Sequence, residues 1–114
     1  MTSNALFPLE PVDYLIIGHI TQDVTPDGLV LGGTASYAAK TAHACGKRVG
    51  IVTSFAPGTP TPQLDGIPII NVPSEYTSTF KTIPTPTGRI QYLQHLASPI
   101  NYSHVPTTWQ NAPI

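Results

Sequence analysis

The sequence has few charged residues and only one cysteine for its length of 114 residues. It contains 5 lysines and arginines against 6 aspartates and glutamates, which gives a net charge of −1. Without a basic surface to attract phosphates, nucleic acid is excluded as the main partner, and so is electrostatic binding to a membrane. One cysteine cannot form an internal disulfide, and the four histidines are scattered singly through the chain, so we expect no metal site.

The sequence also lacks long apolar runs. No stretch approaches the ~18 apolar residues of a membrane span. Residues 1–14 carry no positive charge and contain Pro8, Glu10, Pro11 and Asp13 where a signal peptide would need apolar residues. We therefore expect a cytoplasmic protein without a leader. The hydrophobic fraction of 40% is sufficient for a core.

Proline is plentiful but unevenly distributed. None of the 13 prolines lies between Asp27 and Ala56, whereas seven lie between Pro57 and Pro86. Because proline lacks an N–H donor and is excluded from helix interiors and central strands, the proline-free window should hold regular structure. The second half should contain edge strands and loops.

The first half of the chain has the pattern of a strand–helix–strand unit. The continuous apolar run over Asp13–Ile20 predicts a strand buried on both faces, which favours a parallel α/β sheet. A polar turn over Thr21–Gly28 follows. Thr34 is the expected N-cap of a helix that ends at Gly46, and Val49–Ser54 is the second buried strand. The helix face that packs on the sheet is made of alanine: Ala35, Ala38, Ala39 and Ala42.

The second half predicts three further strands. Ile67–Val72 is an edge strand, and Thr77–Ile83 alternates around a phenylalanine. Arg89–Leu96 alternates polar and apolar residues and is expected to be half-exposed. The last two strands can pair as an antiparallel hairpin across a turn at residues 84–88. Only loops, or a helical turn around residues 106–109, are expected after residue 97.

Two features of the first half suggest a binding site. Gly32 and Gly33 precede a helix N-terminus, where ligand atoms can approach the backbone and its free N–H groups, although a tight turn without a ligand explains them equally well. Asp23 follows the first strand, and its carboxylate could accept hydrogen bonds from vicinal hydroxyls. The alternative for Asp23 and Asp27 is turn chemistry. His19 is interpreted as a polar residue whose hydrogen bonds are satisfied within the protein. The sequence contains no G-x-G-x-x-G pattern, so it does not indicate a dinucleotide site.

Together these features resemble the N-terminal region of the ribokinase/PfkB-type carbohydrate kinases. The resemblance is carried by the strand ending in Gly18, by Asp23, by the glycine pair within Leu31–Ala39, and by Ala44–Ser54. It extends more weakly to about Leu96. It implies an α/β fold, namely a partial ribokinase-like (Rossmann-like) parallel sheet over residues 12–54 and edge or lid strands over residues 67–96. The whole chain, residues 1–114, would be the N-terminal part of such a domain.

The resemblance also implies substrate contacts. Carried over by position, Asp23 and Gly33 contact a sugar or nucleoside-like substrate, and Gly32 shapes the loop. Tyr37 stands where many members have asparagine, so the substrate identity is not inherited and ribose is disfavoured. Tyr37 is included among the expected substrate-binding residues.

The expected function is the substrate-side part of an ATP-dependent carbohydrate kinase. The family's Asp-Thr-x-Gly-Ala-Gly-Asp type segment, which supplies the catalytic base, does not occur in this sequence. No catalytic residue is therefore assigned, and ATP and Mg²⁺ are expected for the complete enzyme but not for this chain alone. The alternative is a non-catalytic polyol-binding or chain-pairing module, for example a homodimer formed through the lid strands.

Overall fold

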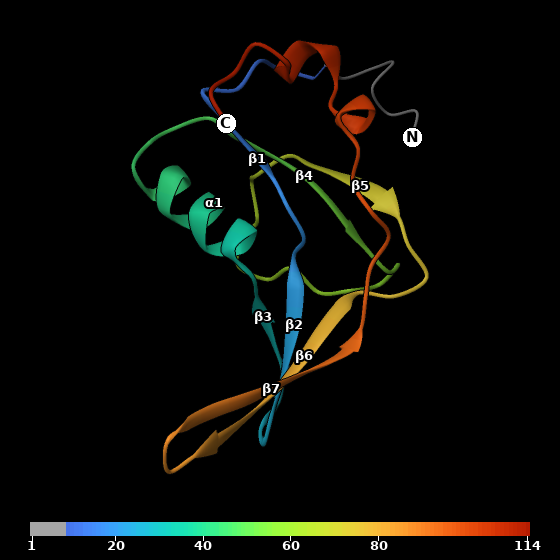
Figure 1. Ribbon diagram of the computed structural model, residues 1–114. Helices are drawn as coiled ribbons and strands as arrows, with labels where there is room; N and C mark the ends of the chain where they lie inside the picture. The colour runs from blue at the N-terminus through green and yellow to red at the C-terminus, as the bar shows by residue number, and fades with distance from the viewer. Residues whose placement is uncertain (1–8) are drawn as a thin grey trace.

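A computed structural model describes residues 9–114, which form two β-sheets and one α-helix (Figure 1). The main sheet contains β1 (Tyr14–Ile17), β4 (Val49–Phe55) and β5 (Ile69–Pro73) in the order β1-β4-β5, with every pair parallel. This arrangement confirms the predicted α/β class with a parallel sheet. The expectation that the chain has no leader concerns in part residues 1–8, which lie outside the described residues.

The helix α1 (Thr34–Ala44) packs on the main sheet through its alanine face, as predicted. Small side chains allow the helix backbone to lie close to the strands. One expectation is wrong: Gly33, not Thr34, is the N-cap, and no side chain caps the helix. Gly46, with φ +81°, ends the helix as expected. The buried helix face, three strand residues and three loop side chains form the first core: Ile16, Ile20, Ala35, Ala39, Ala42, Val49, Ile51, Leu64 and Ile67.

The second sheet, called here the lid sheet, extends away from the main sheet (Figure 1). Its order is β3-β2-β6-β7, and its strands are β2 (Thr21–Thr25), β3 (Gly28–Gly32), β6 (Ser78–Thr85) and β7 (Gly88–His95). The β6–β7 antiparallel hairpin is confirmed. The β2–β6 pair is parallel, so the lid joins segments that are far apart in the sequence.

Two sequence expectations fail at the start of the lid sheet. The predicted strand over Asp13–Ile20 ends at Ile17, and the predicted turn over Thr21–Gly28 is a strand followed by a tight turn into β3. The β2 residues are too polar for a strand buried on both faces. They nevertheless form a strand because β3 and β6 supply backbone hydrogen-bond partners along its two edges. Only the tertiary structure brings β6 next to β2.

The β6–β7 hairpin also differs from expectation in exposure and length. All eight β7 residues are exposed rather than half-exposed, since no layer within the described residues covers the strand. The predicted turn over residues 84–88 is shorter, because Pro84 belongs to β6 and pairs with Arg89 of β7. Pro84 lies beyond the segment of β6 that pairs with β2, where its missing N–H donor breaks no second ladder.

The two sheets meet through a layer of buried hydroxyl groups. The Ile20 amide donates to Thr53 Oγ1 at 2.9 Å, and the Ala97 amide donates to Ser78 Oγ at 3.0 Å. Buried polar groups need such partners, and no buried side-chain nitrogen or oxygen lacks one within residues 9–114. The buried polar residues at this junction and in the adjoining elements are Thr21, Ser36, Thr53, Ser54, Thr77, Ser78 and Thr79.

The segment after β7 covers the other face of the main sheet. It contains two short 3₁₀ turns, at Tyr102–His104 and Thr107–Trp109, of which the second was expected. Trp109 is fully buried, and its Nε1 donates to the Glu10 carbonyl at 2.9 Å. With Leu15, Val52 and Val105 it forms a second core, which the sequence analysis did not predict.

An ion pair joins the start of β1 to the start of β4. Arg48 Nη2 lies 3.0 Å from Asp13 Oδ1, and the Arg48 amide donates to Asp13 Oδ2 at 2.9 Å. The side-chain and backbone hydrogen bonds from Arg48 lower the pKa of Asp13 to about 2, and Asp13 in turn raises the pKa of Arg48. No helix among residues 9–114 is long and apolar enough to cross a membrane.

Candidate functional site

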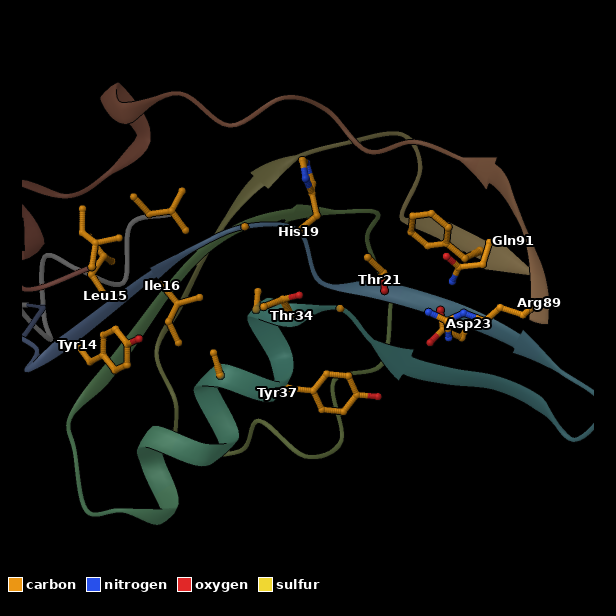
Figure 2. A pocket seen from close by; sticks show the side chains of 17 residues that line it. Tyr14, Leu15, Ile16, His19, Thr21, Asp23, Thr34, Tyr37, Arg89 and Gln91 are labelled. Carbon is orange, nitrogen blue, oxygen red and sulfur yellow. The ribbon is translucent and has the colours of Figure 1, made fainter. Parts of the chain in front are cut away.

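A cavity of about 680 Å³ lies between the lid sheet, β1 and the N-terminus of α1 (Figure 2). It extends from the carboxyl end of β1 along the strand, and the carboxyl ends of strands are where open α/β sheets bind ligands. Three of the four expected site residues, Asp23, Gly33 and Tyr37, line it. The fourth, Gly32, lies directly beneath the Asp23 side chain.

Asp23 is a strand residue whose carboxylate lies against a glycine. It is in the middle of β2, paired with Val30 of β3 and Phe80 of β6, so its expected alternative role in a turn is wrong. A Cβ built on Gly32 would overlap Asp23 Oδ2 and would lie 3.1 Å from Thr21 Oγ1. Glycine at position 32 therefore leaves the room that the carboxylate occupies. No other described side chain forms an ion pair or hydrogen bond with Asp23, so its oxygens are free to accept hydrogen bonds from a ligand.

Gly33 brings the helix N-terminus close to the connection between β1 and β2. Its φ of +93° is a conformation that L side chains rarely adopt, and a Cβ there would lie 2.8 Å from the His19 carbonyl oxygen. Only glycine fits this approach. Ser36 donates its hydroxyl to the Gly32 carbonyl at 2.9 Å, which holds the glycine pair in place. The result is a helix N-terminus, with Thr34 and Ala35, that opens into the cavity.

Tyr37 projects from the first turn of α1 towards the lid sheet (Figure 2). Its ring is half-exposed and carries the ammonium group of Lys40 at 4.7 Å from the ring centroid. Lys40 also donates to Gln63 Oε1 at 2.9 Å, so the ring and the lysine are ordered together. Tyr37 is thus an aromatic wall of the cavity with a phenol at its far end.

His19 is a satisfied polar residue, as interpreted from the sequence. Its Nε2 lies 2.8 Å from the Ser98 carbonyl oxygen, across the junction of the two sheets. Because a carbonyl can only accept, Nε2 carries the proton. His19 therefore ties the β1–β2 connection to the chain that leaves β7.

Three cavity residues were not singled out by the sequence analysis: Phe80 of β6, and Arg89 and Gln91 of β7. The alternation of β7 contained the signal, since residues 89 and 91 lie on one face of the strand. Which face turns inward depends on the pairing of β7 with β6 and of β6 with β2. Both pairings are set by the tertiary structure and not by the local sequence.

The remainder of the cavity is apolar and follows the outer edge of β1. Residues Tyr14 to Ile17 line it together with Ala35, Ala38 and Ile114. The Leu15 amide, which points out of the main sheet, donates to the Pro113 carbonyl at 2.7 Å. This edge of β1 therefore accepts an extended chain as a backbone partner.

The lid end of the cavity carries groups that can form hydrogen bonds with hydroxyls. It combines a free carboxylate, helix N–H groups and two aromatic side chains, Tyr37 and Phe80. Among residues 9–114 no group of three or more potential ligands is placed to hold a metal ion. We assign no metal-binding or phosphate-donor role to any of these residues.

Sequence comparison finds no matching protein-family model and no matching curated protein. Comparison of structures does find matches. A pyrophosphate-dependent kinase in the ribokinase family, complexed with a pyrophosphate analogue and myo-inositol, superposes with a TM-score of 0.64 at 20% identity, covering 80% of this chain. A sulfate complex of a pyrophosphate-dependent kinase in the same family gives a TM-score of 0.60 at 19% identity and also covers 80%.

A third solved structure, at a TM-score of 0.60 and 17% identity, concerns the conversion of a pyrophosphate-dependent myo-inositol-1 kinase into a myo-inositol-3 kinase by two substitutions. At these identities the likeness establishes the fold, which is ribokinase-like, as the resemblance implied. The chain spans only about a third of the length of these neighbours, 35%, 36% and 34% of their chains respectively.

Proposed function

We propose that this chain is the substrate-side part of a kinase that transfers phosphate to a hydroxyl of a sugar, cyclitol or nucleoside-like molecule. The observation that carries the proposal is the Asp23 carboxylate, free of other partners and lying over Gly32 beside the N-terminus of α1. A carboxylate accepts two hydrogen bonds from neighbouring hydroxyls, and helix N–H groups donate to a third oxygen. Support comes from the ribokinase-like fold and from the polyol, myo-inositol, named for one of the neighbours.

In this proposal Asp23 orients the acceptor. Fixing two ligand hydroxyls on one carboxylate leaves a third hydroxyl in a defined direction, which removes rotational freedom before transfer. The aromatic faces of Tyr37 and Phe80 contact the C–H surface of the ring and exclude water. The donor belongs to the complete enzyme. The family resemblance implies ATP with Mg²⁺ as the phosphate donor, whereas the structural neighbours are pyrophosphate-dependent, so both donors are to be tested.

The test is calorimetric titration of the purified chain with myo-inositol, ribose and adenosine. We expect at least one of them to bind, and Asp23→Ala to weaken that binding more than tenfold, because a hydrogen-bonded charged partner is lost. Asp27→Ala is the matched control, since it removes the same charge from the exposed β2–β3 turn. Equal effects of the two substitutions, or no binding by the wild type, would refute the proposal.

A chain-pairing role is the second candidate, and the exposed apolar residues of the lid sheet favour it. Leu29, Ile90 and Tyr92 are between 46% and 60% exposed on β3 and β7, the two edge strands of the lid sheet, and Ile83 of β6 is 38% exposed. We propose a homodimer formed through these strands. Light scattering with size exclusion tests it: Ile90→Lys should convert a dimer to a monomer, whereas a monomeric wild type would contradict the role.

A further inference from the structure

Within residues 9–114 the main sheet ends in two edge strands, β5 and β1, which differ in how they are protected against further pairing. Proteins protect edge strands with prolines, with charges or with a covering segment. β5 follows Pro68 and ends at Pro73, which has no N–H to offer a neighbour. β1 contains neither proline nor charge between Tyr14 and Ile17. The edge of β1 therefore has the character of a strand that is covered by another segment.

The hydrogen bonds to β4 show which backbone groups of β1 face this outer edge. The amides of Tyr14 and Gly18 donate, at 3.2 Å and 3.0 Å, to carbonyl groups of β4 and of the residue before it. Backbone groups alternate between the two sides of a strand, so the even-numbered residues of β1 face β4. The N–H and C=O groups of Leu15 and Ile17 therefore face outwards.

One of these outward groups already binds an extended segment of chain. The Leu15 amide donates to the Pro113 carbonyl at 2.7 Å. Among residues 9–114, no hydrogen-bond partner is found for the Leu15 carbonyl or for either backbone group of Ile17 at this edge. Leu15 is only 1% exposed, and backbone polar groups beside a buried strand need partners. The pairing that begins at Pro113 is thus incomplete along the rest of β1.

The side chains that border this edge are apolar. On the α1 side they are those of Tyr14 and Ile16 together with the small residues Ala35 and Ala38 of the helix, and Ile114, 71% exposed, lies at one end. Figure 2 shows Tyr14 and Ile16 at the end of the cavity away from Asp23. No charged side chain lines this part of the cavity. A segment that enters here would bury uncharged, apolar side chains.

The shape of the edge favours a single extended segment over a second copy of this chain. The outer edge of β1 lies within the cavity, which α1 borders on one side and the lid sheet closes at one end. In a two-fold dimer the β1 of the partner copy would lie in the same kind of recess. Two recessed edges cannot approach to the ~4.8 Å that strand pairing requires, whereas one free strand can enter the cavity.

We propose that the outer edge of β1 binds an extended apolar segment of a separate polypeptide, which adds a strand to the main sheet. Its backbone supplies the partners that Leu15 and Ile17 lack, and its side chains alternate between the face covered by α1 and the face covered by Trp109. The inference goes beyond the proposed function, because the partner binds along β1 and not at Asp23.

The experiment uses the full chain and a blocked synthetic peptide of about six alternating valines and isoleucines, the length of a typical strand, with a lysine at each end for solubility. Calorimetric titration measures the affinity, and hydrogen exchange followed by NMR measures protection of the Ile17 amide. We expect the peptide to bind and to slow exchange of that amide about tenfold or more. The same peptide with every valine and isoleucine N-methylated should bind at least about tenfold more weakly, because its backbone donors are lost.

Ile17→Pro tests the edge directly. It removes an outward N–H and leaves the hydrogen bonds to β4 in place, so it should weaken peptide binding at least about tenfold. Ile69→Pro is the matched control on β5. The Ile51 amide of β4 donates to the Pro68 carbonyl, so the amide of Ile69 faces away from β4, and Ile17 and Ile69 are both partly buried isoleucines. Ile69→Pro should change the affinity less than twofold.

Three results would overturn the proposal: no saturable binding of the unmodified peptide, equal affinities of the two peptides, or equal effects of the two proline substitutions. If Ile17→Pro does not fold, the comparison of the two peptides on the wild-type chain decides. Strong protection of the Ile17 amide in the free chain would mean that the edge is already covered, and would also contradict it. Light scattering then shows whether a second copy covers the edge.

Discussion

The substitution Gly50→Ala tests how tightly the main sheet packs against Trp109. A Cβ built on Gly50 would lie 2.8 Å from Cη2, 2.8 Å from Cζ3 and 2.9 Å from Cζ2 of the Trp109 ring, closer than side-chain carbons normally approach. Trp109 is fully buried and its Nε1 is hydrogen-bonded to the Glu10 carbonyl, so the ring cannot move away without losing that bond. Gly50 therefore leaves the space on β4 that the Trp109 ring occupies.

The expected cost follows from two opposing effects. Overpacking a core costs about 1–3 kcal/mol. Replacing glycine by alanine restricts the unfolded chain and returns about 0.4–1 kcal/mol. The net destabilisation is therefore roughly 0–2.6 kcal/mol, with a central value of about 1.3 kcal/mol, and at that value the melting temperature should fall by roughly 5–10 °C.

The assay is thermal unfolding followed by the fluorescence of Trp109, the only tryptophan in the chain, and by circular dichroism. Gly18→Ala is the control, because a Cβ there meets only the Ala35 Cβ at 3.5 Å, an ordinary contact. In a Trp109→Phe background, followed by circular dichroism, the cost of Gly50→Ala should fall by more than half. An equal cost in both backgrounds would refute the packing argument.

Three further substitutions probe the site and the ion pair. Gly32→Ala should displace the Asp23 carboxylate and weaken polyol binding at least tenfold in calorimetry, with a change in melting temperature of a few degrees at most. Tyr37→Phe should lower polyol affinity by about two- to tenfold if the phenol binds the ligand, and should leave it unchanged if only the ring does. Asp13→Asn should lower the melting temperature at neutral pH. Because the pKa of Asp13 is depressed to about 2 in the folded chain, the stabilisation by Arg48 is present above pH 3.8 and is lost as the pH falls towards 2, so the melting curves of variant and wild type should converge there.

Local patterns predicted the helix and the buried strands well. The alanine face of α1, the terminating Gly46 and the β4 strand depend on residues within a few positions of each other, and the structure confirms them. The N-cap was misassigned because Gly33, in its left-handed conformation, begins the helix without any side-chain cap. The start of this helix depends more on the path of the backbone that leads into it than on any single side chain.

The candidate site was only partly visible in the sequence. Asp23, Gly32, Gly33 and Tyr37 occur within one short segment, and the structure gathers them at one end of the cavity. Their substrate role stays a prediction. Arg89, by contrast, is far from them in sequence and reaches the cavity because β6 pairs with β2 and β7 pairs with β6.

The sequence by itself determined the class of fold and the glycine-rich approach to the helix, because apolar periodicity and glycine conformation act over a few residues. Tertiary structure alone decided that Thr21–Thr25 is a strand, that Trp109 belongs to the core, and that the free charges of Asp23 and Arg89 border one cavity. Backbone hydrogen bonds between distant strands and the burial of an aromatic ring against a distant glycine have no local signature. Their partners are brought together only when the chain folds.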